Sequence, residues 1–167
     1  MYHRCYDPRF AGHSPTPDML DASIVIAAPC EVVFRAFFDH GAMSAWWQVA
    51  RSVTTPRTLG PYVVEWVPTD FRDEVLGRLG GVFHGTVLEI RPSRGFIVAE
   101  AYWLPPDGDP IGPMALEVAC EPAGVNATHV RVTQTGFEES IRWRRYYDVI
   151  QHGWERALVS LKALLEH

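Results

Sequence analysis

The sequence predicts an α+β domain in which an antiparallel β-sheet of about six to seven strands wraps round a long C-terminal helix, with two short helices after the first strand. Three features of the chain lead to this prediction. An early strand precedes two short helical stretches, the middle of the chain alternates apolar and polar residues between turns, and the end carries one long apolar stripe. The long helix is the one element large enough to cover the apolar face of such a sheet.

The first strand and the two short helices are expected within residues 20–47. Apolar residues recur at every second position from Leu20 to Ile26, which is the spacing of a half-buried strand. Pro29 is predicted to occupy the first position of a helix that runs to about Phe38, because its backbone needs no hydrogen-bond partner there. A break at 39–41 then precedes a second short helix, predicted over residues 42–47.

The middle of the chain has the pattern of an antiparallel meander. Five segments alternate apolar and polar residues, at positions 62–67, 82–90, 96–104, 114–121 and 129–133. Glycine- and proline-containing turns separate them, as in sheets built from neighbouring antiparallel strands. Residues 71–81 are punctuated by glycine, and we expect them to form a lid over the mouth of a cavity.

The C-terminal segment, residues 138–166, is predicted to be one long helix. Its apolar residues recur at steps of three and four and form one stripe: Tyr146, Tyr147, Ile150, Trp154, Leu158, Leu161 and Leu165. A helix of roughly 29 residues is about 43 Å long, which is enough to cross a whole sheet. Charged residues, among them Arg142 and Arg156, are expected on the opposite face.

Composition and charge limit the classes of function. The chain has 167 residues, and we expect a flexible N-terminal arm over residues 1–18 and a single domain over 19–167. A net charge of −5 argues against nucleic acid as a partner. The three cysteines are far apart, so neither a disulfide framework nor a metal site is predicted, and no cofactor is expected. No membrane span is predicted, and a cytoplasmic location is expected.

Several motifs, taken in order, resemble the START-like (SRPBCC, helix-grip) superfamily, and in particular its branch of activator of Hsp90 ATPase homologues. The motifs are Ala28-Pro29-x-Glu31-x-Val33-Phe34-x-Ala36, Trp46-Trp47, the stretch from Gly85 to Ile90 with Pro92, and Gly153-Trp154-x-x-x-Leu158-x-x-Leu161-x-x-x-Leu165. The resemblance extends from Leu20 to Glu166. It implies a helix-grip fold with an internal hydrophobic cavity. It implies no single chemistry, because the superfamily includes lipid carriers, polyketide cyclases and co-chaperone domains.

A cavity between the sheet and the long helix is expected to bind a small hydrophobic or aromatic molecule. The residues predicted to line it are mostly aromatic: Trp46, Trp47, Tyr62, Trp66, Phe83, Tyr102, Met114, Tyr147, Ile150 and Trp154. Tryptophan and tyrosine are informative because a buried N–H or O–H group needs a hydrogen-bond partner, which a ligand would provide. The alternative is that these side chains form an ordinary core.

An acid–base group is predicted if His84, Glu100 and Tyr102 all face the cavity. Glu100 and Tyr102 are expected to share a face with Phe96 and Val98. Burial would raise the pKa of a glutamate and lower that of a histidine, which suits acid–base catalysis. The alternative, favoured from the sequence, is that these residues lie on the solvated outer face.

Three functions are compatible with the residue pattern and the resemblance. The first is binding of a small hydrophobic ligand, and the second is a polyketide cyclase- or hydratase-like enzyme that uses the acid–base group. The third is a co-chaperone-type protein-interaction module. The sequence does not decide whether the chain is an enzyme. A second copy of the chain, in a homodimer, is a further possible partner.

Overall fold

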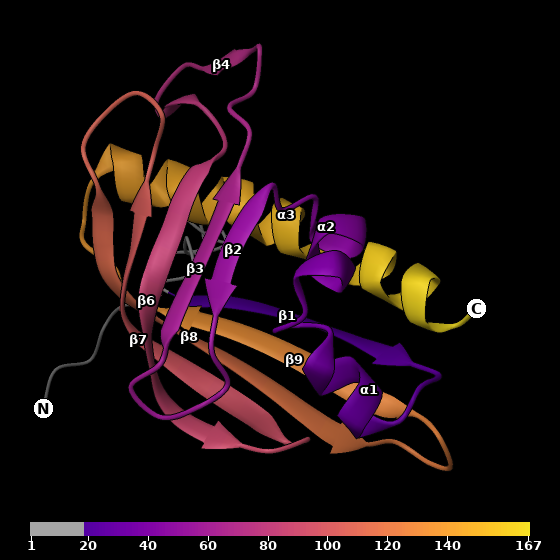
Figure 1. The fold of residues 1–167 in the computed structure, drawn as a ribbon. Coiled ribbons are helices and arrows are strands. Elements are labelled where there is room, and N and C mark those ends of the chain that lie inside the picture. The colour runs from indigo at the N-terminus through magenta and orange to yellow at the C-terminus, as the bar shows by residue number, and fades with distance from the viewer. Residues whose placement is uncertain (1–18) are drawn as a thin grey trace, which may run out of the picture.

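The computed structural model describes residues 19–167 of the chain (Figure 1). The predicted N-terminal arm lies outside the described residues. The elements are β1 (Met19–Ile26), α1 (Cys30–Arg35), α2 (His40–Trp47), β2 (Arg51–Thr54), β3 (Pro61–Trp66), β4 (Arg72–Asp73), β5 (Gly77–Arg78), β6 (Gly81–Arg91), β7 (Gly95–Leu104), β8 (Ile111–Pro122), β9 (Thr128–Thr135) and α3 (Ile141–Leu165).

Seven strands form one antiparallel sheet in the order β1-β9-β8-β7-β6-β3-β2. The edge strand β2 was not predicted. It has only four residues, none of them fully buried, so its alternation of apolar and polar residues is weak. The strands β4 and β5 pair separately within the predicted lid. The α+β class, the number of strands and the two short helices after the first strand are confirmed.

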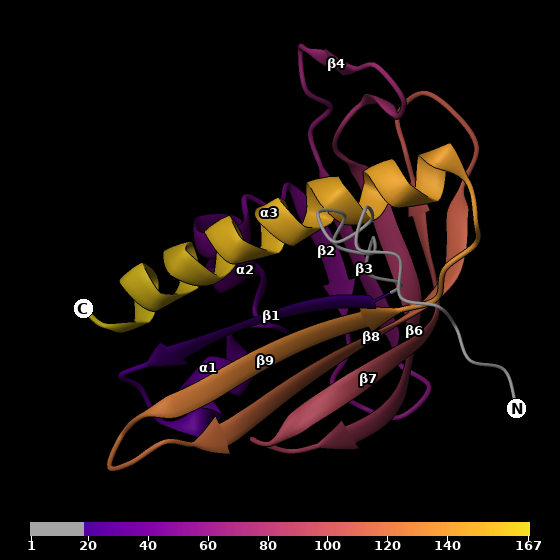
Figure 2. The same ribbon diagram turned by 180° about the vertical axis from the view of Figure 1, so that it is seen from behind.

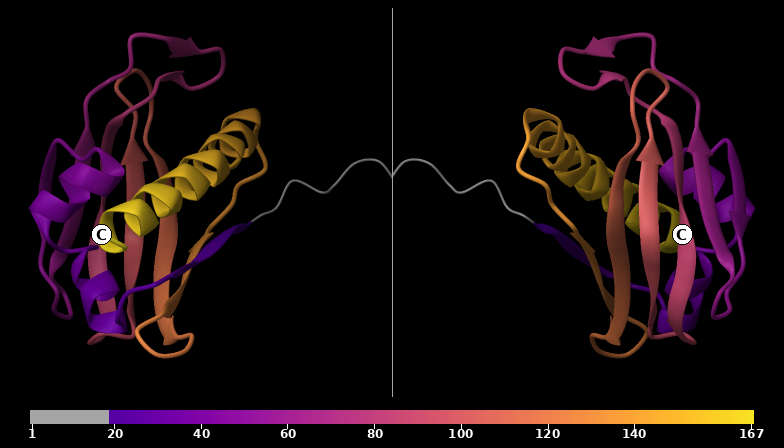
Figure 3. Two further views of the ribbon diagram at one scale, coloured as in Figure 1. Left: turned by 90° about the vertical axis from the view of Figure 1, so that its right-hand side faces the viewer. Right: turned by 90° about the vertical axis from the view of Figure 1, so that its left-hand side faces the viewer.

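The long helix α3 crosses the concave side of the curved sheet and packs on β1 and α2 (Figures 2 and 3). Its predicted stripe forms the contact, since Tyr146, Trp154, Leu158 and Leu161 are all buried. Alternate residues of β8 and β9 are buried beneath the helix, as expected for strands with one solvated face. The helix is therefore held by the sheet along its apolar side.

Side-chain caps set the starts of two helices. Ser140 accepts a hydrogen bond from the backbone N–H of Trp143, so α3 begins at Ile141, later than predicted. Asp39 accepts from the N–H of Ala42 and caps α2, which begins at His40, two residues earlier than predicted. Pro29 is extended and lies before the first helical residue, so its predicted place inside α1 is wrong by one position.

A β-bulge in β7 reverses the side-chain alternation of that strand. His84 pairs with Tyr102 and Thr86 with Ala99, so two steps on β6 face three on β7. Glu100 takes up the extra residue with a left-handed φ of 50°. The bulge determines which side chains of β7 face α3.

Candidate ligand-binding pocket

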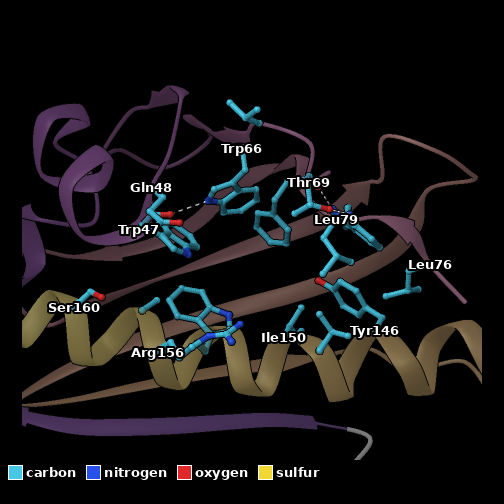
Figure 4. Close-up of a pocket in the computed structure, with 18 of the residues that line it drawn as sticks. Trp47, Gln48, Trp66, Thr69, Leu76, Leu79, Tyr146, Ile150, Arg156 and Ser160 are labelled. Atoms are coloured by element: carbon cyan, nitrogen blue, oxygen red, sulfur yellow. Dashed lines mark hydrogen bonds between the residues drawn. The ribbon is translucent and has the colours of Figure 1, made fainter. Parts of the chain in front are cut away.

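A pocket of about 690 Å³ lies between α3 and the part of the sheet nearest to α2 (Figure 4). Its size falls in the range of about 300–1,000 Å³ that is common for small-molecule sites. The wall is mostly apolar and comprises Trp46, Trp47, Gln48, Trp66, Val67, Thr69, Leu76, Leu79, Gly80, Phe83, Trp103, Gln134, Tyr146, Val149, Ile150, Gly153, Trp154, Arg156, Ala157 and Ser160.

Four tryptophans from three elements form one side of the pocket. The rings of Trp46 and Trp47 are stacked, with centroids 5.0 Å apart and an interplanar angle of 6°. Trp47 also meets the edge of Trp66 at 5.2 Å and contacts Trp154 of α3 at 4.8 Å. Figure 4 shows Trp47 and Trp66 facing α3 across the pocket. Residues far apart in the sequence therefore present their rings to one space, and we call these four side chains the indole cluster.

Backbone contacts fix the position of the indole cluster. The Trp66 Nε1–H donates to the carbonyl oxygen of Trp47 at 3.0 Å, which ties the end of β3 to the end of α2. Trp46 donates its Nε1–H to the carbonyl of Ala36 at 2.9 Å. Gln48 ends α2 in the left-handed conformation, with φ 58°, and lies at the edge of the pocket. Trp46 and Trp66 are thus held by hydrogen bonds within the protein.

The other end of the pocket is formed by Trp103, Tyr146 and the cap segment, which we define as residues 67–80. The rings of Trp103 and Tyr146 are stacked with centroids 5.3 Å apart. Trp103 donates its Nε1–H to the carbonyl of Gly80 at 2.7 Å. Gly80 has a φ of +95°, and a Cβ there would lie 2.6 Å from the carbonyl oxygen of Val67, so only glycine fits.

The cap segment corresponds to most of the predicted lid, and two of its leucines reach the pocket wall. Leu76 is buried and Leu79 is half buried. Figure 4 shows both near Tyr146. The Oγ1 of Thr69 accepts a hydrogen bond from the N–H of Leu79 and stabilises the turn. The cap segment therefore closes one end of the pocket with apolar side chains.

Ion pairs hold the cap segment to the rest of the domain. Asp73 accepts two hydrogen bonds from Arg145 of α3, at 2.6 and 2.8 Å, and its side chain is only 6% exposed. The Arg145 guanidinium, assisted by backbone N–H groups, lowers the pKa of Asp73 to about 2. Arg78 donates to Asp107 in the β7–β8 turn at 2.9 and 3.1 Å, and lowers the pKa of Asp107 to about 2.

One polar pair lies inside the pocket. The Gln134 Nε2 amide donates to the Tyr146 hydroxyl at 2.8 Å and contacts the Met114 sulfur at 3.1 Å. Burial raises the pKa of Tyr146, which keeps its hydroxyl protonated. The hydroxyl accepts from the amide, so its own proton is left to donate. If the amide is turned over, the amide N–H becomes the remaining donor.

Gly153 leaves space in the middle of α3. A Cβ added at this position would meet no atom within 4 Å. A glycine inside a helix costs about 1 kcal/mol relative to alanine. The helix therefore carries a destabilising residue at the point where it borders the pocket.

The structure places six of the ten predicted ligand-binding residues in the pocket wall: Trp46, Trp47, Trp66, Phe83, Ile150 and Trp154. The other four lie elsewhere. Tyr62 is fully buried and donates its hydroxyl to the carbonyl of Phe37 at 2.8 Å. Met114 is buried behind Gln134, and Tyr147 donates its hydroxyl to the carbonyl of Gly136. Tyr102 lies on the outer face of the sheet.

The three candidate acid–base residues do not meet in the pocket. The predicted shared face of Glu100, Tyr102, Phe96 and Val98 is wrong, because the bulge at Glu100 changes the alternation. Phe96 and Val98 are buried before it, and Ala101 and Trp103 after it. Tyr102 therefore points outwards, where its ring stacks on His84 at 5.7 Å, and Glu100 is exposed.

Several residues of the wall were not predicted from the sequence. On α3, the pocket side includes Val149, Gly153, Arg156, Ala157 and Ser160. These continue the spacing of three and four from Tyr146, which is the signal that would have found them. Arg156, which was predicted on the charged face, is exposed and also borders the pocket. Trp103 and Gln134 depend on the bulge and on strand register, which the sequence pattern does not show.

Within residues 19–167, no three or more His, Cys, Asp or Glu side chains gather as a metal site would require. None of the helices in this range combines the length and hydropathy of a membrane span.

Comparison with solved structures gives many similar folds. A protein from Mesorhizobium loti superposes with a TM-score of 0.67 at 21% identity, over 88% of this chain and 96% of that one. A protein from Chromobacterium violaceum gives 0.64 at 24%, over 90% and 99%. The Aha1 dimer from Colwellia psychrerythraea gives 0.60 at 20%, over 89% and 96%. At these identities the likeness shows the fold alone.

No curated protein matches the chain. The sequence model of one family, described as "Activator of Hsp90 ATPase homolog 1-like protein", matches residues 27–166. The match spans α1 to α3 and includes every residue of the pocket wall. The chain therefore belongs to the family of activator of Hsp90 ATPase homolog 1-like proteins.

Proposed function

We propose that the protein binds a small, flat, mainly apolar molecule in the pocket between α3 and the indole cluster. The observation that carries this proposal is open space of about 690 Å³ that is lined mainly by aromatic and aliphatic side chains. A well-packed interior leaves few voids larger than a water molecule. Family membership fits both ligand binding and a co-chaperone-type interaction, and the pocket is what favours ligand binding.

Gly153 gives independent support. A larger residue at this position would fill part of the pocket and would improve the helix propensity of α3. The glycine is thus unfavourable for the helix and favourable for an open site. This is the balance that ligand binding would require.

The geometry gives less support to the cyclase-like alternative. His84 and Tyr102 lie on the outer face of the sheet, and Glu100 is exposed at the bulge. The part of the pocket wall that the structure describes contains no aspartate, glutamate or histidine. Tyr146 and Gln134 are its polar pair, and burial raises the pKa of the tyrosine. Acid–base catalysis near neutral pH would need a group whose pKa lies closer to 7.

The test is a titration with pyrenebutanol, an uncharged flat molecule whose absorption overlaps tryptophan emission. Energy transfer from the indole cluster to pyrene reports binding in the pocket. The wild-type protein is expected to bind with one saturable site. Gly153→Phe places a ring in the open space, so we expect Kd to rise at least about ten-fold, or about 1.4 kcal/mol.

His152→Phe is the matched control, because it adds the same ring one residue away, where the His152 side chain is 70% exposed. We expect its Kd to stay within about two-fold of the wild-type value. Circular dichroism melts confirm that both variants fold. Equal affinities for the wild type and Gly153→Phe, or no saturable binding to the wild type, would contradict the proposal.

A further inference from the structure

The pocket wall carries one charge. Arg156 is the sole ionic side chain among the described lining residues, in a chain whose net charge is −5. Its guanidinium is exposed at the rim of the pocket, within reach of a charged group on a bound molecule. A negatively charged group on a ligand would supply a counter-ion.

Arg156 has no hydrogen bond or ion pair with the residues that the structure describes, unlike the other basic residues of α3. Each of those has a partner: Arg142 donates to the carbonyl of Asp109, Arg144 pairs with Glu139, Arg145 with Asp73, and Lys162 with Glu166. The residues three and four positions from Arg156 along the helix are His152, Gly153, Val159 and Ser160. No carboxylate on its own helix therefore lies one turn away on the same face.

Indole N–H groups of the pocket wall are further donors. Trp46, Trp66 and Trp103 donate their indole N–H groups to backbone carbonyls. The Trp47 and Trp154 N–H groups donate to no residue that the structure describes. Neither nitrogen is sealed from the pocket or solvent, because none of the described side chains has a buried polar atom without a partner. Their two rings are 4.8 Å apart.

The pocket thus combines flat apolar walls with one cation and free donors. A ligand that matches it has ring-shaped apolar surface and a single acceptor group that carries one negative charge. A carboxylate fits the guanidinium best, since its two oxygens match the planar fork of arginine. A phosphate dianion would leave half of its charge uncompensated by one arginine.

We infer that the ligand is a ring-bearing organic acid, bound with its rings against the indole cluster and its carboxylate at Arg156. This inference rests on the proposed function and specifies its ligand class. The acid group would pair with the guanidinium of Arg156, and the Trp47 and Trp154 N–H groups would be further donors within the pocket. Arg156 is exposed at the rim, so the acid would lie near the mouth and the rings deeper inside.

The test compares pyrenebutyrate with pyrenebutanol, which share the same rings and differ in the acid group. We expect the wild-type protein to bind the acid at least about five-fold more tightly, as for an ion pair with direct hydrogen bonds near the surface. Arg156→Gln should reduce this ratio to about one. Arg144→Gln, which removes an equal charge from the same helix away from the pocket, should keep it.

The outcomes separate the two proposals. If both probes bind with equal affinity, the acid preference is wrong while ligand binding stands. If neither binds, both proposals fail. If the preference for the acid survives in Arg156→Gln, or disappears in Arg144→Gln, then the preference arises from the electrostatic field of the whole protein. Either result would overturn the role of Arg156. Competition with pyrenebutyrate tests whether the ligand needs rings, with dodecanoate as an acid without rings and 2-naphthoate as an acid with rings. If dodecanoate displaces pyrenebutyrate as effectively as 2-naphthoate does, the inference that the ligand carries rings is wrong.

Discussion

Two aromatic clusters lie in the same concave interior, and they differ in how they are packed. The filled cluster consists of Phe34, Phe37, Phe38, Tyr62 and Phe96, with ring centroids 4.7–6.1 Å apart. The indole cluster, Trp46, Trp47, Trp66 and Trp154, has similar spacings of 4.8–5.2 Å. The indole cluster borders open space, whereas Phe37, Tyr62 and Phe96 are completely buried.

The two clusters differ in residue type and also in the state of their polar atoms. The Tyr62 hydroxyl in the filled cluster donates to a backbone carbonyl. In the indole cluster, Trp47 and Trp154 donate to no described residue. Buried polar groups in a finished core are normally paired. The indole cluster therefore differs from the filled cluster in having donors that stay open to the pocket or to solvent.

The largest expected effect tests the filled cluster. Phe96→Ala removes a completely buried ring that contacts four other aromatic side chains. We expect the free energy of unfolding to fall by about 3–5 kcal/mol, because the truncation leaves a cavity in a packed core. Urea denaturation measures this loss. A loss below about 1 kcal/mol would mean that the two clusters are equally loosely packed.

An intermediate effect is expected where the cap segment is attached beside the open pocket. Asp73→Asn keeps an oxygen for the backbone N–H groups of Val75 and Leu76 but loses the charge that binds Arg145. We expect a loss of stability of about 1–2 kcal/mol by thermal or urea denaturation. Asp148→Asn is the matched control, because Asp148 pairs with the same arginine at the surface, and its loss should stay below about 0.5 kcal/mol.

The effect of Asp73 should depend on pH. Its pKa of about 2 in the folded protein lies below the ordinary value, so the ionised form is favoured by folding. The stabilisation is complete above about pH 4 and is lost as the pH falls towards 2. The stability difference between the wild type and Asp73→Asn should therefore be about half as large at pH 3 as at pH 6. An unchanged difference would show that the ion pair does not attach the cap segment.

The smallest effects are expected on the outer face of the sheet. His84→Ala and Glu100→Gln lie away from both clusters. We expect each to change stability by no more than about 0.5 kcal/mol and to leave pyrenebutanol binding unchanged. A large loss of binding in either variant would show that the outer face is coupled to the pocket and that the indole cluster does not act alone.

Much of the fold could be predicted because it depends on local patterns. The alternation of apolar and polar residues predicted most of the strands, and apolar residues at steps of three and four predicted α3. The bulge at Glu100 could not be predicted, since a glutamate with positive φ has no sequence signature, and the bulge decides whether Trp103 or Tyr102 faces inwards. Arg156 is exposed as predicted, but helix periodicity does not show that the pocket extends to this residue, because it does not show where the sheet leaves α3 uncovered.

A crystal structure of the protein with pyrenebutyrate would decide whether the space between α3 and the indole cluster is a ligand site. We predict the pyrene rings against Trp47 and Trp154, with the carboxylate within hydrogen-bond distance of Arg156. A complex in which the indole cluster has closed and the pyrene lies elsewhere would contradict the assignment of this pocket as the site.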